Sequence, residues 1–361
     1  MKKSKIKNQK SKIIVAMSGG VDSSVAAALL KRAGFDVAGV FMKFWLASPK
    51  LPGSEGGKGF NRCCSIESQF RARQVAAKIG IPFYVFNFEK EFKKRIVDCF
   101  LRDYKAGLTP NPCVVCNREI KFGLLLEKSL ALGADYIATG HYVKVKNGKL
   151  FQAKDKAKDQ SYFLWQLNQK QLSRILFPLA DYTKSEVRKL AKKFGLPTAA
   201  TPDSQEICFV PDTINNFLAK YIKQKKGNIV DIKGNVLGKH DGLAFYTIGQ
   251  RKGIGLSEGP YWVLDKDFKK NTLIITKDEK DLLKKELFFK NANWLSGKEP
   301  RFPVKITAKI RYRHEAVPAT IYKTQDTKYK IQFVRPQRAI TPGQSVVFYK
   351  GAELLGGGII C

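Results

Sequence analysis

Three of the seven cysteines stand in patterns that could carry sulfur or metal chemistry. Cys113 and Cys116 form a CxxC in TPNPCVVCN, and Cys208 ends the run TPDSQEIC. In a reducing cytosol, clustered cysteines indicate metal binding or sulfur chemistry more than a disulfide framework. Two thiolates suffice for sulfur delivery, because one can hold an outer sulfur as a persulfide and the other can release it by exchange. A CxxC alone is also typical of a zinc knuckle.

The chain around the CxxC is expected to be a constrained loop. Pro110 and Pro112 restrict its backbone, and a helix is predicted to begin near Arg118. The start of that helix and the Arg118 guanidinium favour the thiolate form. The other four cysteines have no motif and are interpreted as buried or idle thiols: Cys63, Cys64, Cys99 and Cys361.

A second stretch, KIIVAMSGGVDSS, has the composition of a phosphate-binding loop. An apolar strand runs into Ser18-Gly19-Gly20-Val21-Asp22-Ser23-Ser24, and a helix follows. The glycines let backbone N–H groups turn toward an anion, the helix start adds positive dipole, and the serines add hydroxyl donors. Asp22 could hold Mg²⁺ on the phosphates or merely complement the helix dipole. The alternative for the whole stretch is a glycine-rich turn whose serines cap a helix.

The elements that must position these residues alternate between strand and helix from Lys12 to about Tyr142. Such alternation predicts βαβ units and a parallel sheet with both faces covered, an α/β fold. Ligands bind beyond the carboxyl ends of such strands. Long connections are expected at 46–62 and 107–117, the second carrying the CxxC.

The pattern of predicted helices and strands changes after Val210. A predicted helix over 215–227 gives way to short strands with turn signals, and from about Glu286 the chain consists of successive β segments. We therefore expect a catalytic α/β domain over 1–209, a small mixed linker domain over 210–283 and a barrel-like β domain over 284–361.

The charge is strongly basic, with 65 Lys and Arg against 31 Asp and Glu, a net charge of +34. Such a surface attracts polyanions and supports a nucleic-acid partner. No apolar run approaches the roughly 20 residues of a membrane helix, and no hydrophobic stretch precedes the first strand. We expect a cytoplasmic protein without a membrane partner.

Seven motifs together resemble the bacterial tRNA-specific 2-thiouridylase family of the ATP-pyrophosphatase superfamily. They are SGGVDSS, TPNPxxxCN, TGHY, KDQSYFL, DSxxICF, TIGQRKGIG and TPGQSxVFY, in the family's order over nearly the whole chain. The resemblance implies that ATP and Mg²⁺ adenylate the 2-oxygen of the wobble uridine of a tRNA and that sulfur then replaces it. It also implies a sulfur-donor partner, such as a cysteine desulfurase or a relay protein.

The resemblance also assigns residues. Cys116 becomes the nucleophile that forms a disulfide and Cys208 the persulfide carrier. ATP contacts fall on Ala16, Met17, Ser18, Gly19, Gly20, Val21, Asp22, Ser23, Met42 and Gly140. tRNA contacts fall on Asn111, Pro112, Cys113, His141, Lys158, Asp159, Gln160, Arg311, Tyr312 and Gln344.

One position departs from the family pattern. The best-known members have Asp where this chain has Cys113, so this loop is a CxxC. Cys113, Cys116 and Cys208 could hold three irons of a [4Fe–4S] cluster, with the fourth iron binding a sulfide donor. Zinc on the same three ligands is a third possibility. The cluster is favoured because a persulfide relay leaves Cys113 unexplained.

Several of these residues also have plain structural interpretations. Met42 at a strand end could be core, His141 a satisfied histidine and 158–160 a polar helix start. Alternation in a strand would put Arg311 and Arg313 on one face, with Tyr312 packing inward or stacking on a base.

Two other functions remain open. A different ATP pyrophosphatase, such as an amidating synthetase, would share SGGVDSS but would not need the cysteine pair. A non-catalytic RNA-binding protein would leave the phosphate loop without a purpose.

Overall fold

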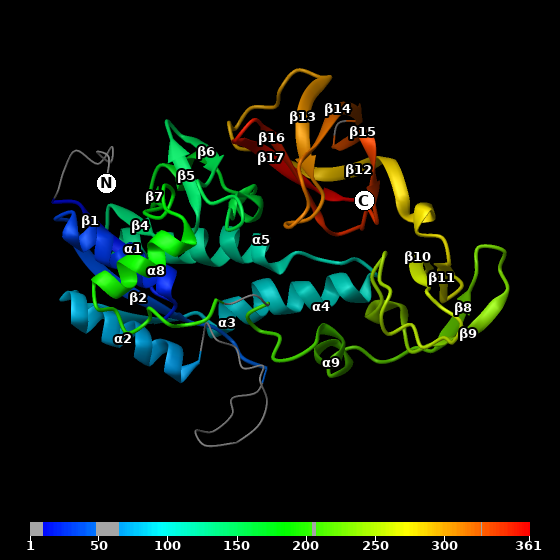
Figure 1. The fold of residues 1–361 in the computed structure, drawn as a ribbon, viewed down its shortest axis with the longest axis horizontal. Helices are drawn as coiled ribbons and strands as arrows, with labels where there is room; N and C mark the ends of the chain where they lie inside the picture. The colour runs from blue at the N-terminus through cyan, green and yellow to red at the C-terminus, as the bar shows by residue number, and fades with distance from the viewer. Residues whose placement is uncertain (1–9, 48–64, 204–206, 326) are drawn as a thin grey trace.

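A five-stranded parallel sheet forms the N-terminal part of the chain, in the order β3-β2-β1-β4-β7. Figure 1 labels β1, β2, β4 and β7 of this sheet. The computed structural model describes residues 10–47, 65–203, 207–325 and 327–361; Cys63 and Cys64 lie outside these ranges. The five parallel strands confirm the predicted α/β fold. The strands are β1 (Lys12–Ala16), β2 (Asp36–Lys43), β3 (Phe83–Asn87), β4 (Tyr136–Ala138) and β7 (Ile175–Leu176).

Helices cover both faces of this sheet, because successive side chains of a buried strand point to opposite sides. Ile13 and Val15 of β1 pack with one helical layer, whereas Ile14 and Ala16 pack with the other. The first layer comprises α1 (Val21–Arg32), α2 (Ile66–Ile79) and α8 (Lys184–Lys193). The second comprises α3 (Glu89–Phe92), η1 (Lys93–Val97), α4 (Asp98–Lys105), α5 (Pro112–Cys116), η2 (Asn117–Leu124) and α6 (Leu125–Ala131).

The expected loop around the cysteine pair is wrong, because the helix already begins at Pro112. Proline suits a first helical position, where its missing N–H would have no partner. The segment continues from α5 into the π-helical η2, so Cys113 lies on the first turn of a long helical run and Cys116 on the next turn.

A hairpin leaves the sheet region and joins the C-terminal barrel. Asn147 and Gly148 at its tip have φ of 53° and 72°, as an Asn-Gly turn requires. Its strand β6 (Lys149–Gln152) pairs with β17 at Glu353 and Leu354. The hairpin partner is β5 (Val143–Lys146), and short elements η3 (Ser161–Leu164) and α7 (Gln169–Leu172) follow.

Six antiparallel strands close the predicted barrel, because β17 pairs with both β16 and β12. Its interior is the apolar cluster that includes Phe289, Ile331 and Phe348. The strands are β12 (Leu283–Trp294), β13 (Val304–Lys309), β14 (Val317–Gln325), β15 (Lys328–Arg338), β16 (Ser345–Lys350) and β17 (Glu353–Ile360).

A small middle unit separates the sheet region from the barrel, as expected. Its helix is shorter than predicted, ending at Ala219 rather than continuing to 227. The elements are α9 (Ile214–Ala219), β8 (Gly227–Val230), β9 (Val236–His240), η4 (Leu243–Phe245), β10 (Trp262–Asp267), β11 (Thr272–Thr276) and η5 (Glu279–Leu282). No helix of the described residues is both long and apolar enough to cross a membrane.

The connection from α4 to α5 is bonded to both later units. Lys266 of β10 donates from Nζ to the carbonyl oxygens of Gly107 at 2.7 Å and Tyr246 at 3.0 Å. In the barrel region, Pro342 accepts from the Thr109 backbone N–H at 2.9 Å, and Gln344 Nε2 donates to the Thr109 carbonyl at 2.9 Å. We call Gly107–Asn111 the tethered connection.

Replacing Lys266 should change how stability depends on pH. Burial lowers the pKa of Lys266 to about 8 from its ordinary 10.5, although the charge of Asp265 opposes this. Between these values the unfolded chain holds a proton that the folded chain has lost, so stability rises with pH by up to about 1.4 kcal/mol per pH unit from this group. Urea unfolding should show wild type gaining stability over Lys266→Met from pH 8 to 9.5. Parallel pH curves would contradict this.

Candidate active site

One cavity of about 1330 Å³ opens at the carboxyl edge of the parallel sheet. Its lining comes from the ends of β1, β2 and β4, from α5, from residues 247–250 of the middle unit and from the barrel. Such an edge is where open α/β sheets bind ligands. All three parts of the chain therefore contribute to one site.

The phosphate loop is pre-shaped by its own hydroxyl groups. The Ser18 backbone N–H donates to Ser23 Oγ at 3.1 Å, and Ser23 Oγ donates to the Gly20 carbonyl at 3.2 Å. Ser18 and Ser23 line the cavity. The expectation for Ser24 is wrong, because this serine is fully buried and its hydroxyl donates to the Gly20 carbonyl at 2.8 Å.

Two glycines allow close backbone contacts of this loop. Gly19 lets the loop approach α2, and Gly140 lets the chain after β4 approach the loop. Gly19 has φ of 75°, and a Cβ there would lie 2.2 Å from the Ser68 carbonyl oxygen in α2. At Gly140 a Cβ would lie 2.6 Å from the Ser23 nitrogen. Any side chain at 140 would therefore push against the phosphate loop.

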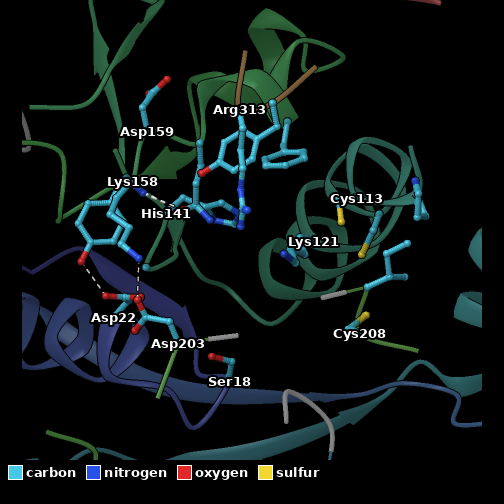
Figure 2. A pocket seen from close by; sticks show the side chains of 18 of the residues that line it. Ser18, Asp22, Cys113, Lys121, His141, Lys158, Asp159, Asp203, Cys208 and Arg313 are labelled. Atoms are coloured by element: carbon cyan, nitrogen blue, oxygen red, sulfur yellow. Dashed lines mark hydrogen bonds and ion pairs between the residues drawn. The ribbon is translucent and has the colours of Figure 1, made fainter. Parts of the chain in front are cut away.

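Lys184, which the sequence did not single out, binds the loop's carboxylate. Its Nζ lies 2.7 Å from both carboxylate oxygens of Asp22 and 2.9 Å from Asp203 Oδ1. The Tyr142 hydroxyl donates to Asp22 Oδ1 at 2.7 Å. Figure 2 shows Asp22 and Asp203 together on one side of the pocket.

Asp203 belongs to a cluster of opposite charges at the cavity wall. It accepts from Lys158 at 2.7 Å and from Arg188 at 2.8 Å, besides Lys184. Burial pushes the pKa of Asp203 upward, but the hydrogen bonds and charges of Lys158 and Lys184 outweigh it and hold the pKa at about 2. The carboxylate is therefore charged at neutral pH.

The three motif cysteines face the same cavity from different environments. Cys113 is exposed, Cys208 is half-buried and Cys116 is buried. In Figure 2, Cys113 and Cys208 lie on the right of the pocket and Asp22 and Asp203 on the left. Within the described ranges, no three His, Cys, Asp or Glu side chains are grouped so that they could hold a metal ion. The thiols thus share a cavity without forming a preassembled ligand set.

His141 lies at the cavity wall between aromatic rings. Its ring centroid is 5.6 Å from that of Phe122 and 6.2 Å from that of Phe177. Burial, and then the charge of Lys121, hold the pKa of His141 well below its usual range. The imidazole is therefore neutral, and its Nδ1 lies 2.7 Å from the Thr139 hydroxyl.

The predicted tripeptide at 158–160 is bonded within the chain. Lys158 pairs with Asp203, and Gln160 Oε1 accepts from the Tyr142 backbone N–H at 3.0 Å. Asp159 is buried and accepts from the Ser161 hydroxyl at 2.7 Å. A short 3-10 turn follows. Through these bonds the three residues stabilise the wall of the cavity that they also line.

The strand expected at Arg311–His314 is wrong, because β13 ends at Lys309 and the next residues form a turn. The Arg311 guanidinium donates to the Ala339 carbonyl at 2.7 Å and to Thr341 Oγ1 at 2.9 Å. Tyr312 packs on Phe163 with ring centroids 4.5 Å apart. Arg313 is exposed and also lines the cavity.

Most of the predicted site residues lie around this one cavity. Of the whole set, Gly19 and Asn111 do not line it. Met42 does so while packing partly against the core. The lining residues that the sequence analysis did not assign include Lys121, Tyr142, Lys184, Asp203, Thr247, Ile248, Gly249 and Gln250. Residues 247–250 begin the motif TIGQRKGIG, and their place in that motif was the sequence signal that could have assigned them to the site.

The sheet and its loop define the class of protein, a HUP-domain enzyme of the ATP-pyrophosphatase type. Residues 11–212 match the family model described as tRNA methyl transferase HUP domain. Residues 215–277 match the corresponding PRC-barrel domain, and residues 284–360 match the aminomethyltransferase beta-barrel domain.

Full-length relatives identify the family more closely. The chain is 48% identical over 360 residues to tRNA-specific 2-thiouridylase MnmA of Lachnoclostridium phytofermentans, covering 97% of this chain and 99% of that protein. It is 49% identical to the protein of the same name from Halothermothrix orenii, covering 97% and 98%. The chain belongs to the tRNA-specific 2-thiouridylase family.

Enlarging Gly140 should weaken nucleotide binding without unfolding the protein. In Gly140→Ala the new Cβ meets the backbone of Asp22 and Ser23, and relieving such overpacking costs about 1–3 kcal/mol. If the loop yields, titration calorimetry should show MgATP binding weakened at least about tenfold. The melting temperature serves as the control. Unchanged affinity would contradict the role of this loop in binding the triphosphate.

Proposed function

We propose that this chain adenylates a tRNA uridine at its 2-oxygen with ATP and replaces that oxygen by sulfur. The observation that carries the proposal is the shared cavity, which is lined by the phosphate loop, the three motif cysteines and basic residues of the barrel. Membership of the 2-thiouridylase family supports the same reaction.

The phosphate loop would bind the triphosphate in the first step. Backbone N–H groups at the start of α1, including that of Ser23, would contact its oxygens together with the Ser18 hydroxyl. Asp22 would hold Mg²⁺, which neutralises charge on the departing pyrophosphate. The uracil 2-oxygen attacks the α-phosphorus, the bond to pyrophosphate breaks, and the N3 proton is lost to solvent. Adenylation turns that oxygen into a leaving group.

The cysteines would supply sulfur in the second step. The outer sulfur of a Cys208 persulfide attacks C2, and AMP leaves with the former uracil oxygen. The Cys116 thiolate then attacks Cys208 Sγ, so a disulfide forms and the transferred sulfur stays on the base. A thiol reductant and a sulfur-donor protein would reset the pair. Cys208 is half-buried and Cys116 is buried, and both line the same cavity, which suits one sulfur that meets a donor and one that is kept inside.

The remaining assignments are part of the same proposal. Arg311, Tyr312 and Gln344 would contact the tRNA from the barrel region, as the resemblance implies, and the exposed Arg313, which lines the same cavity, would add a phosphate contact. The target base must leave its stack to enter the cavity, which suits an anticodon position. The overall charge of +34 would favour binding of the polyanion.

The role of Cys113 separates two routes of sulfur delivery. If the three thiols hold a [4Fe–4S] cluster, Cys113→Ala should remove iron and thiolation together, as should Cys116→Ala and Cys208→Ala. If sulfur travels as a persulfide, Cys116 and Cys208 alone are indispensable. We adopt the persulfide route in place of the cluster that the sequence favoured, because no three His, Cys, Asp or Glu side chains of the described residues are grouped to hold a metal ion.

A set of cysteine variants tests the proposed reaction and this choice. We expect Cys208→Ala and Cys116→Ala to lose thiolation but retain tRNA-dependent pyrophosphate release, while Cys113→Asp keeps both and holds no iron after anaerobic purification. Cys99→Ala, in α4 and outside the cavity lining, is the matched control. Iron bound by wild type and lost from Cys113→Asp together with thiolation would establish the cluster route. Pyrophosphate release at the same rate with and without added tRNA would refute the proposed function.

A further inference from the structure

The proposed reaction leaves a disulfide between Cys116 and Cys208, and the core shields both sulfurs. Cys116 is 7% exposed and belongs to an apolar cluster, and Cys208 packs half-buried against the same cluster. The next residue, Phe209, is 2% exposed, and its ring meets those of Phe92 and Phe100 edge-on. Reduction requires a thiolate to approach one of the two sulfurs. A folded reductant therefore has poor access to this disulfide.

Cys113 places a third thiol one helical turn from Cys116. It is exposed and lines the same cavity, and Figure 2 shows it on the same side of the pocket as Cys208. The Asn117 backbone N–H donates to the carbonyl oxygens of Cys113 and Val114, so the backbone of the CxxC is helical. Val114 is 2% exposed and holds this turn in the core.

The helical spacing brings Cys113 within reach of Cys116. Side chains three residues apart are neighbours on one face of a helix. Their Cα atoms lie about 5 Å apart, and disulfides span Cα separations of roughly 4.4–6.8 Å. The Cys113 thiolate can therefore attack Cys116 Sγ without a rearrangement of the helix.

We propose that Cys113 is a resolving thiol that moves the disulfide from the core to the exposed end of the CxxC. Its thiolate attacks Cys116 Sγ, the Cys113–Cys116 bond forms, the Cys116–Cys208 bond breaks, and Cys208 leaves as a thiolate. One disulfide replaces another, so the exchange needs no oxidant or reductant. The attack is intramolecular, because both groups belong to one helix. This inference rests on the proposed function.

The partner that fits this step is a protein dithiol reductant. One of its thiolates attacks the exposed Cys113 Sγ, and Cys116 leaves as a thiolate. The second thiol then attacks the mixed disulfide, which restores the Cys113 thiolate and leaves the disulfide on the reductant. Cys208 stays reduced throughout this step and can take up the next sulfur.

A small thiol bypasses Cys113. The cavity of about 1330 Å³ admits such a molecule to the Cys116–Cys208 disulfide itself. For this reason Cys113→Asp is expected to keep thiolation when a small thiol is the reductant. The role of Cys113 is therefore visible only when the reductant is a folded protein.

A single turnover shows where the disulfide ends. Enzyme loaded with persulfide by a cysteine desulfurase and cysteine is desalted, mixed with ATP and tRNA, quenched with iodoacetamide and mapped by peptide mass spectrometry. Wild type should carry a Cys113–Cys116 disulfide and alkylated Cys208, whereas Cys113→Ser should carry a Cys116–Cys208 disulfide. A wild-type enzyme that holds only the Cys116–Cys208 disulfide would overturn the inference.

Multiple turnovers show which reductant needs Cys113. Thiolation is driven either by dithiothreitol or by thioredoxin with thioredoxin reductase and NADPH. Cys113→Ser should match wild type with dithiothreitol, but its steady-state rate with thioredoxin should fall at least about tenfold. Cys99→Ser, in α4 and outside the cavity lining, is the matched control and should keep both rates. Equal rates of wild type and Cys113→Ser with thioredoxin would contradict the proposal.

A measurement without tRNA separates this inference from the proposed function. Diamide oxidises the thiols, and the recovery of reduced Cys208 is then followed with thioredoxin or with dithiothreitol. Cys113→Ser should recover like wild type with dithiothreitol but at least about tenfold more slowly with thioredoxin. Equal recovery with thioredoxin would overturn the inference. Failure of the proposed function is detected separately, as wild type that releases no pyrophosphate with tRNA and dithiothreitol.

Discussion

The site depends on the tethered connection, Gly107–Asn111, which is bonded to two units distant in sequence. Its backbone groups are bound by Lys266 from the middle unit and by Pro342 and Gln344 from the barrel region. The connection leads directly into α5, whose first turn carries Cys113. A shift of either later unit would therefore act on the cysteine pair through this backbone.

This arrangement explains why the cavity needs all three units. The parallel sheet supplies the phosphate loop at its carboxyl edge, and the helix α5 supplies two thiols on the facing wall. The barrel closes the remaining side, and the hairpin strand β6 extends its β17. Gln344 lines the cavity while bonding the connection, so tRNA bound near it would lie against the element that positions Cys113.

Local sequence signals predicted the parts of the fold that local physics determines. The alternation of strand and helix predicted the parallel sheet, and this prediction was confirmed. The positive φ of Gly19 and the turn at Asn147 and Gly148 likewise reflect backbone geometry that these residue types permit. The cysteine loop was mispredicted because the restriction that proline places on the backbone is also compatible with a helix start, which Pro112 occupies. The turn at Arg311 was missed because its partners Ala339 and Thr341 come from distant sequence.

The charge network could not be found by spacing. Asp22, Lys184 and Asp203 lie in three separate segments, and only the packing of α8 beside α1 brings them together. Lys184 alone resembles any lysine at the start of an exposed helix. The motif around Cys208 contains Asp203, but nothing in the sequence indicated that this carboxylate faces the phosphate loop.

The central claim is that ATP activates the uracil 2-oxygen by adenylation and that sulfur then replaces this oxygen. Oxygen tracing tests it most directly, with substrate tRNA carrying ¹⁸O at the 2-oxygen of the target uridine. The account predicts one labelled oxygen in AMP for each thiolated uridine and no label in pyrophosphate, because the uracil oxygen attacks the α-phosphorus and leaves with it. Thiolation accompanied by unlabelled AMP, or label in pyrophosphate, would contradict the account.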